Sequence, residues 1–116
     1  MFEPIIKQRP EFISEVFRVL GDKNRLHILW LLNRKELCVC EITEICGLSQ
    51  SNVSQHLSKL KSVGLVKERR KAQWIYYSLN TTDFPIVKEI CGLLPEYDGD
   101  IAKLEALSDD SKCNLS

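Results

Sequence analysis

The sequence predicts a mostly helical domain that carries one two-stranded β-hairpin, and two features of the chain indicate this fold class. Between Glu11 and Ser62, apolar residues recur at spacings of three and four, which is the period of amphipathic helices. After Gly64 the period shortens to two over residues 65–70 and 74–79, where β-branched and aromatic residues typical of strands are frequent. A chain of 116 residues is long enough for one domain with one core.

Five helices are expected, four before the hairpin and one after it. Their expected ranges are about 11–20, 23–33, 39–46, 49–62 and 84–94, and a further helical turn or two is expected near 101–107. The second helix is apolar on most of its sides, so it should be the most buried element. We divide the chain into an N-terminal arm (1–10), a central domain (11–97) and an acidic C-terminal tail (98–116), which is expected to be disordered from Ser108.

Charge is distributed unevenly along the chain, although the formal net charge is zero. Residues 49–79 contain six basic residues and one acidic residue, whereas residues 80–116 contain three basic and eight acidic residues. Because a surface that contacts nucleic-acid phosphates is basic, the middle segment is a candidate for DNA binding. The alternative is that this segment is a solvated charged face that the acidic tail balances.

The expected order of helix, glycine-containing turn, helix and hairpin is that of a winged helix-turn-helix. The second helix of such a unit enters the major groove, and the hairpin, called the wing, reaches the DNA backbone or minor groove. Glutamine and asparagine can read adenine edges, serine can bond to several bases, and lysine suits phosphates. The predicted DNA-binding residues are Gln50, Ser51, Asn52, Ser54, Gln55, His56 and Lys59 of the helix, and Arg69, Arg70 and Lys71 of the wing. A winged helix that binds protein instead of DNA is the alternative.

Cys38 and Cys40 form a Cys-x-Cys pair at the start of the third expected helix. Thiolates select soft metal ions, and the N-terminus of a helix should favour the thiolate form. Residues two apart on a regular helix point about 200° away from each other, so they do not converge on one ion. Cys38 must therefore lie at or before the start of the helix, or the first turn must distort. The alternative is that both cysteines are small buried hydrophobic residues.

Four segments together resemble the ArsR/SmtB family: residues 36–42 (ELCVCEI), 47–57 (GLSQSNVSQHL), 60–66 (LKSVGLV) and 74–79 (WIYYSL). The resemblance covers about residues 11–94 and implies a winged-helix homodimer with the first and last helices at its interface. It also implies a repressor, not an enzyme, that binds a palindromic double-stranded DNA operator and releases it when an inducer binds. The residues apolar enough to form the interface are Phe12, Val16, Val19, Ile86, Ile90 and Leu94.

The same resemblance implies that Cys38 and Cys40 are metal ligands, because the family's Glu-Leu-Cys-Val-Cys segment marks members that respond to arsenite, antimonite, cadmium or lead. Thr43 stands where the arsenite-responsive members have a third cysteine. Two thiolates suffice for a monomethyl arsenical, so we expect arsenite or another trivalent arsenical as the inducer, with no organic cofactor. The last helix contains no histidine, and no structural zinc is expected.

A third ligand, the response to other inducers and the location of the protein stay open at this point. Cys91 on the last helix is a possible third ligand, Cys46 is expected to be structural, and Cys113 is on the tail. A redox- or sulfide-responsive repressor and a cadmium- or lead-responsive one are the alternatives. The chain has no Cys-x-x-Cys of the thiol oxidoreductase kind. It shows no signal peptide and no apolar run of about 20 residues, so we expect a cytoplasmic protein that does not contact the membrane.

Overall fold

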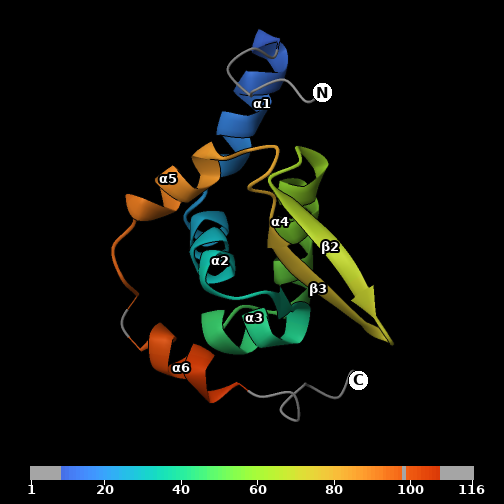
Figure 1. The fold of residues 1–116 in the computed structure, drawn as a ribbon, viewed down its shortest axis with the longest axis vertical. Coiled ribbons are helices and arrows are strands. Elements are labelled where there is room, and N and C mark those ends of the chain that lie inside the picture. The colour runs from blue at the N-terminus through green and yellow to red at the C-terminus, as the bar shows by residue number, and fades with distance from the viewer. Residues whose placement is uncertain (1–8, 98, 108–116) are drawn as a thin grey trace.

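The computed structural model describes residues 9–97 and 99–107, and it has the expected mostly helical architecture with a projecting hairpin (Figure 1). Its helices are α1 (Pro10–Leu20), α2 (Lys23–Arg34), α3 (Val39–Cys46), α4 (Gln50–Ser62), α5 (Ile86–Gly92) and α6 (Asp100–Ala106). The strands are β1 (Leu37–Cys38), β2 (Val66–Lys71) and β3 (Trp74–Leu79). Most of the expected N-terminal arm and the expected disorder from Ser108 fall outside the described residues.

Helix α2 lies at the centre of the molecule, surrounded by the other helices (Figure 1). Its residues Ile28, Leu29 and Leu31 have no exposed surface, which confirms that it is among the most buried elements. Val53 and Leu57 of α4 are buried against the same core, at the spacing of four that the sequence pattern predicts. One side of α4 is thereby fixed to the core, and its other side remains at the surface.

Polar side chains define where the helices around the turn begin. The Asp22 carboxylate accepts hydrogen bonds from the backbone N–H groups of Asn24 (2.8 Å) and Arg25 (3.1 Å) at the start of α2. The Ser49 hydroxyl accepts one from the Asn52 N–H (3.1 Å) at the start of α4. Gly47 ends α3 with a φ of 73°, a left-handed conformation that favours glycine. Serine and aspartate caps with a glycine stop thus set the geometry of the helix-turn-helix.

The wing is the two-stranded hairpin of β2 and β3 that the sequence predicts, and a third strand that was not predicted, β1, joins its sheet in the order β1-β3-β2. Strand β1 pairs antiparallel with β3, so that Leu37 lies opposite Tyr77 and Cys38 lies opposite Tyr76. A strand of two residues is too short to show an alternating pattern, which is why the sequence gives no sign of it. As a consequence, the segment that leads into α3 is joined by backbone hydrogen bonds to the wing.

The C-terminal helix α6 runs across α3 on the side away from α1 (Figure 1). Its Asp100 carboxylate lies 2.6 Å from Nε2 of His27, and the Tyr97 ring stacks on the imidazole with ring centroids 4.0 Å apart. Lys103 donates from Nζ to the carbonyl oxygen of Ile45 in α3 (3.4 Å). A segment about 70 residues later in the chain thereby covers much of the His27 side chain. No helix among residues 9–97 and 99–107 is long and apolar enough to cross a membrane.

Candidate nucleic-acid interface and cysteine pocket

The outward face of α4 carries the polar side chains that the sequence analysis predicted to read DNA. All of the predicted residues of this helix except His56 are exposed, namely Gln50, Ser51, Asn52, Ser54, Gln55 and Lys59. None of them is acidic, and Lys59 and Lys61 lie in the last turn of the helix. An uncharged polar face with cations at one end can enter a groove and contact flanking phosphates.

His56 differs from the other predicted residues of α4, because its ring is half-buried and faces α2. Its Nδ1 lies 3.3 Å from Nη1 of Arg25, whose own Nε donates to the carbonyl oxygen of Val19. Burial lowers the pKa of His56, and the nearby Arg25 and Lys59 cations lower it further, against the Asp22 carboxylate. A neutral imidazole can accept the Arg25 hydrogen bond, so the pair holds α4 against α2.

The wing presents its basic residues at the surface, but they are not equivalent. Arg70 and Lys71 are exposed near the tip of the hairpin. Arg69 is also exposed, yet its guanidinium donates twice to the Glu36 carboxylate, from Nε (3.0 Å) and from Nη2 (2.6 Å). The Arg69 hydrogen bond is the largest influence on Glu36 and holds the pKa of that carboxyl below its usual range. The guanidinium fork of Arg69 is therefore occupied by Glu36, a contact that no local sequence signal indicates.

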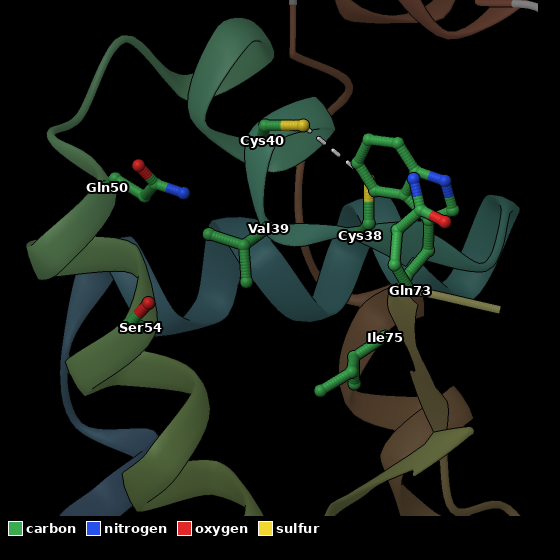
Figure 2. A pocket seen from close by; sticks show the side chains of 8 residues that line it. Cys38, Val39, Cys40, Gln50, Ser54, Gln73 and Ile75 are labelled. Carbon is green, nitrogen blue, oxygen red and sulfur yellow. Dashed lines mark hydrogen bonds between the residues drawn. The ribbon is translucent and has the colours of Figure 1, made fainter. Parts of the chain in front are cut away.

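Cys38 and Cys40 converge, because Cys38 lies just before α3 rather than within it. Cys38 is the N-cap residue, with an extended backbone (φ −94°, ψ 170°), and Cys40 lies in the first turn. Their sulfur atoms are 3.8 Å apart (Figure 2). Two thiolates bound to one tetrahedral ion at about 2.3 Å each are also about 3.8 Å apart. The sequence left two alternatives, that Cys38 lies at or before the start of the helix or that the first turn distorts. The first alternative is confirmed.

The surroundings of Cys38 disfavour its thiolate form, whereas the helix N-terminus was expected to favour it. Burial raises the pKa of the Cys38 thiol, and the neighbouring Glu41 carboxylate raises it further. Glu41 is itself buried, and its Oε1 accepts the backbone N–H of Cys38 (3.0 Å). Cys38 is only 3% exposed, and the cost of burying a charged thiolate outweighs the stabilisation of that thiolate by the N-terminus of the short helix. Deprotonation of Cys38 therefore has to be driven by a ligand that displaces the proton.

A pocket of about 170 Å³ opens beside the two cysteines. It is lined by Cys38, Val39 and Cys40 of the α3 start, Gln50 and Ser54 of α4, and Gln73, Trp74 and Ile75 of the wing. Figure 2 shows Gln50 and Ser54 on one side of it and Gln73 and Ile75 on the other. The wing residues of the pocket were missed by the sequence analysis, because they lie more than 30 residues from the cysteines and carry no metal-binding side chain. The pocket touches both predicted DNA-reading elements.

The other described cysteines lie apart from this pocket. The Cys46 thiol is 3.7 Å from Nδ1 of His27, and burial raises its pKa to about 11. Cys91 is buried in the core, where it donates to the Leu29 carbonyl oxygen (3.5 Å) and burial raises its pKa to about 11. Neither lines the pocket. Within residues 9–97 and 99–107, no group of three or more histidine, cysteine, aspartate or glutamate residues could hold a metal ion.

Two further facts bear on the thiols. Cys40 is disulfide-bonded in the structure, so ligation of an ion by the Cys38–Cys40 pair requires the reduced protein. Cys113, whose part in sensing the sequence left open, lies outside the described residues. Cys38, Cys46 and Cys91 are free thiols. The structure of one chain therefore brings two of the candidate ligands together and leaves Cys91 separate.

Helices α1 and α5 lie next to each other (Figure 1), and residues of both line one small pocket. Phe17 is 63% exposed, Ile86 is 38% exposed and Leu93 is 82% exposed. A small apolar pocket of about 60 Å³ lies here, lined by Ile13, Val16, Phe17, Leu20, Leu65, Ile86 and Ile90. Val16 and Val19, which were expected at an interface, are buried in the chain's own core, and Phe17 is the exposed aromatic residue of α1. This face has the apolar character of a surface that a partner covers.

Comparison with known proteins agrees with this geometry. The family model described as "Bacterial regulatory protein, arsR family" matches residues 22–68, from the cap of α2 into the wing. The chain is 46% identical over 66 residues to the arsenic resistance transcriptional regulator ArsR1 of Pseudomonas putida, a match that spans 56% of this chain and 52% of that protein. It is 40% identical over 84 residues to the arsenical resistance operon repressor of Bacillus subtilis, spanning 72% of this chain and 74% of that protein.

A solved structure shares the fold. The homodimeric winged helix-turn-helix DNA-binding domain of Mb0332 from Mycobacterium bovis, titled a possible ArsR-family regulator, superposes with a TM-score of 0.63 at 29% identity. The superposition covers 75% of this chain and 83% of that domain. These relatives are named as regulators and not as enzymes. The chain is a winged helix, and it belongs to the arsR family of bacterial regulatory proteins.

Proposed function

We propose that this protein is a homodimeric transcriptional repressor that binds a palindromic DNA operator and releases it when a trivalent arsenical binds Cys38 and Cys40. The observation that carries the proposal is the location of the cysteine pair. Its two sulfur atoms, 3.8 Å apart, line a pocket that α4 and the wing also line. An ion bound there contacts the elements that hold the DNA.

The DNA-binding part of the proposal is supported by the chemistry of the two exposed surfaces. Gln50, Asn52 and Gln55 offer amide groups from the outward face of α4, and such groups pair with adenine edges in the major groove. Arg70 and Lys71 extend from the wing, where they can contact phosphates. Two similar proteins carry names that agree with DNA binding: one is named a repressor and the other a DNA-binding domain.

Dimerisation follows from the exposed apolar face and from the DNA itself. A palindromic operator presents two equivalent half-sites, and a dimer with two-fold symmetry presents two recognition helices to them. Burial of Phe17, Ile86 and Leu93 between two copies would remove three large apolar side chains from water. The similar domain of Mb0332 is titled as homodimeric.

The inducer part rests on thiol chemistry and on the relatives. Trivalent arsenic is thiophilic, and two relatives are named for arsenic or arsenical resistance. The cysteine pair is joined directly to both neighbouring elements, because the Cys38 backbone pairs with Tyr76 of β3 and Cys40 lies in the first turn of α3. An ion bound to both sulfur atoms therefore acts on the start of α3 and, through the strand pairing of Cys38, on the wing.

The test is fluorescence anisotropy of the reduced full-length protein on a labelled duplex selected from a random double-stranded library. Binding that weakens linearly with log salt supports the DNA interface, and salt-independent or absent duplex binding contradicts it. Arsenite, a phenylarsenical, cadmium and hydrogen peroxide are then titrated against the complex. Release by an arsenical supports the proposed inducer, and release by peroxide alone or by cadmium alone contradicts it.

Thiol oxidation is the second candidate signal, and one observation favours it. Cys40 is disulfide-bonded in the structure, so this cysteine can exist in an oxidised form. Cys40 lies in the first turn of α3, so forming or breaking its disulfide acts at the same place as an arsenical would. The peroxide arm of the titration distinguishes the two signals, because an arsenical releases DNA from the fully reduced protein without any oxidant.

A further inference from the structure

We propose that the C-terminal segment 108–116 docks over the pocket beside Cys40 in the oxidised protein, where a disulfide between Cys113 and Cys40 holds it across part of the DNA-reading surface. The inference rests on the DNA-binding part of the proposed function. It goes further by naming the segment that occupies this surface and the bond that holds it there. This segment lies outside the described residues, and its place is inferred from the thiols, the chain length and the charges around the pocket.

The state of the cysteines identifies the partner of Cys40. The chain has five cysteines in all. Cys40 is disulfide-bonded. The free thiols among the described residues are Cys38, Cys46 and Cys91. Of the five cysteines, this leaves Cys113 to share the bond with Cys40. The bond links the start of α3 to the C-terminal segment.

The length of the chain beyond α6 allows this bond. Leu107 lines a pocket together with Ile45 of α3, so the described part of the chain ends beside that helix. Helix α3 has eight residues and is therefore about 12 Å long, and Cys40 lies in its first turn. The six residues from 108 to 113 can span about 20 Å when extended. The segment is thus long enough to run along the whole of α3 and to bring Cys113 to the Cys40 sulfur.

A segment bonded to Cys40 lies against residues that are predicted to read DNA. The pocket that Cys40 lines has Gln50 and Ser54 of α4 on one side and Gln73 of the wing on the other (Figure 2). Gln50 and Ser54 are exposed and are two of the predicted base-contacting residues. The disulfide therefore holds the segment beside the face of α4 that a bound duplex has to occupy.

The charges of the segment and of the wing are complementary. Asp109 and Asp110 precede Cys113 by three or four residues. On the wing, the exposed Lys71 lies directly opposite Trp74, which lines the pocket. Carboxylates held beside this cation compete with phosphate for it and repel the DNA backbone. The tethered segment thus lowers the affinity for DNA both by covering part of α4 and by its charge.

Formation of the tether is a two-electron oxidation, and a peroxide is the oxidant. One of the two thiols attacks the O–O bond of hydrogen peroxide, which gives a sulfenic acid and one molecule of water. The other thiol then displaces the sulfenic hydroxyl, so that the S–S bond forms and a second molecule of water leaves. Both thiol protons end in water, and the peroxide takes up both electrons. A phosphine reductant reverses the step and becomes the phosphine oxide.

The first test maps the disulfide in the full-length protein after treatment with hydrogen peroxide. Cleavage after glutamate and lysine separates residues 37–41, which contain Cys38 and Cys40, from residues 113–116, which contain Cys113. Mass spectrometry without reduction should find these two peptides linked. The link should persist in Cys38→Ser and be absent from Cys40→Ser. Its absence from the oxidised wild type overturns the inference.

The second test compares the oxidised and reduced proteins on the selected duplex by fluorescence anisotropy. The oxidised wild type should bind about tenfold more weakly than the reduced wild type, and the phosphine should restore the affinity. Cys113→Ser, given the same peroxide treatment, should keep the affinity of the reduced protein because it cannot form the tether. Cys46→Ser removes a thiol that is free in the structure, so it is the matched control and should lose affinity as the wild type does.

The outcomes separate this inference from the proposed function. A linked wild type that binds DNA as tightly as the reduced protein, or an equal loss of affinity in the wild type and in Cys113→Ser, overturns the inference and leaves the proposed function standing. Failure of the reduced wild type to bind any duplex overturns the proposed function and the inference together. The inducer is tested apart from the tether in reduced Cys113→Ser, which keeps Cys38 and Cys40 and should still release DNA when an arsenical is added.

Discussion

Cys38 and Tyr76 lie opposite each other in adjacent antiparallel strands, so the residue that caps α3 also belongs to the sheet of the wing. Glu36, two residues earlier, reaches Arg69 on the far strand of the same sheet. The segment from Glu36 to Cys40 therefore connects the cysteine pair to the wing by both backbone and side-chain contacts. A movement of the cysteines would therefore be transmitted directly to the wing.

Glu36→Gln should raise the affinity of the protein for duplex DNA and steepen its dependence on salt. The substitution removes one negative charge beside the wing and frees the Arg69 guanidinium, which can then neutralise one more phosphate. The slope of log K against log salt should increase by about one. Anisotropy titrations at several salt concentrations measure it. Glu105→Gln on α6 removes the same charge from an element other than α4 and the wing and should leave the slope unchanged. A weaker or salt-insensitive Glu36→Gln complex would show that the ion pair serves only to position the wing.

Stability should fall as the pH drops through the range in which His56 titrates. Burial depresses the pKa of His56 in the folded protein below its ordinary value of 6.5, so the unfolded state binds the proton more readily. The resulting stability is present above about pH 6.5 and is lost as the pH falls towards the folded-state pKa. Thermal unfolding at pH 8 and pH 5.5 measures this difference. His56→Gln should reduce the difference, and an unchanged pH dependence in that variant would contradict the assignment.

Asp100→Asn should destabilise the packing of α6 on α2, which contains His27. The Asp100 carboxylate is buried and lies 2.6 Å from Nε2 of His27, so its loss leaves a half-buried imidazole with a weaker partner. The free energy of unfolding should fall by about 1–3 kcal/mol. Urea denaturation measures the loss, and limited proteolysis reports release of the C-terminal segment. Glu105→Gln on the exposed side of the same helix is the control, and equal stability of the two variants would count against a structural role for this contact.

Gly64→Ala should destabilise the junction between α4 and the wing. Gly64 has a φ of 87°, and an added Cβ would lie 3.0 Å from Cε2 of Phe84. The backbone strain alone costs about 1–3 kcal/mol, and the Phe84 ring must also shift. Gly92→Ala provides the comparison, because an added Cβ there meets nothing within 4 Å and Gly92 lies in α5. Denaturation curves for the two variants should differ clearly, and matching curves would contradict the strain at Gly64.

The features that could be predicted from the sequence are those determined by local patterns. The Ser49 cap, the Gly47 stop and the apolar spacing of Val53 and Leu57 gave α4 to within one residue. The Cys-x-Cys spacing likewise required Cys38 to precede the helix or the turn to distort. In each case the decisive interactions lie within a few residues of one another.

The features that could not be predicted depend on contacts between distant segments. His27 meets Asp100, 73 residues later, and Arg69 meets Glu36, 33 residues earlier. Strand β1 is too short to carry a period, and the pocket at the cysteines takes its apolar wall from Trp74 and Ile75. Burial of Cys38 depends on the same long-range packing, which is why the effect of the helix N-terminus on its thiol was overestimated.

The central claim is tested most directly by release of the selected duplex from the reduced protein as a phenylarsenical is added. The wild-type complex should dissociate, and Cys38→Ser and Cys40→Ser should each remain bound at concentrations that release the wild type. Cys46→Ser and Cys91→Ser should still release the duplex, because their thiols lie away from the pocket. If both Cys38→Ser and Cys40→Ser release DNA as the wild type does, the cysteine pair is not the sensor and the account is wrong.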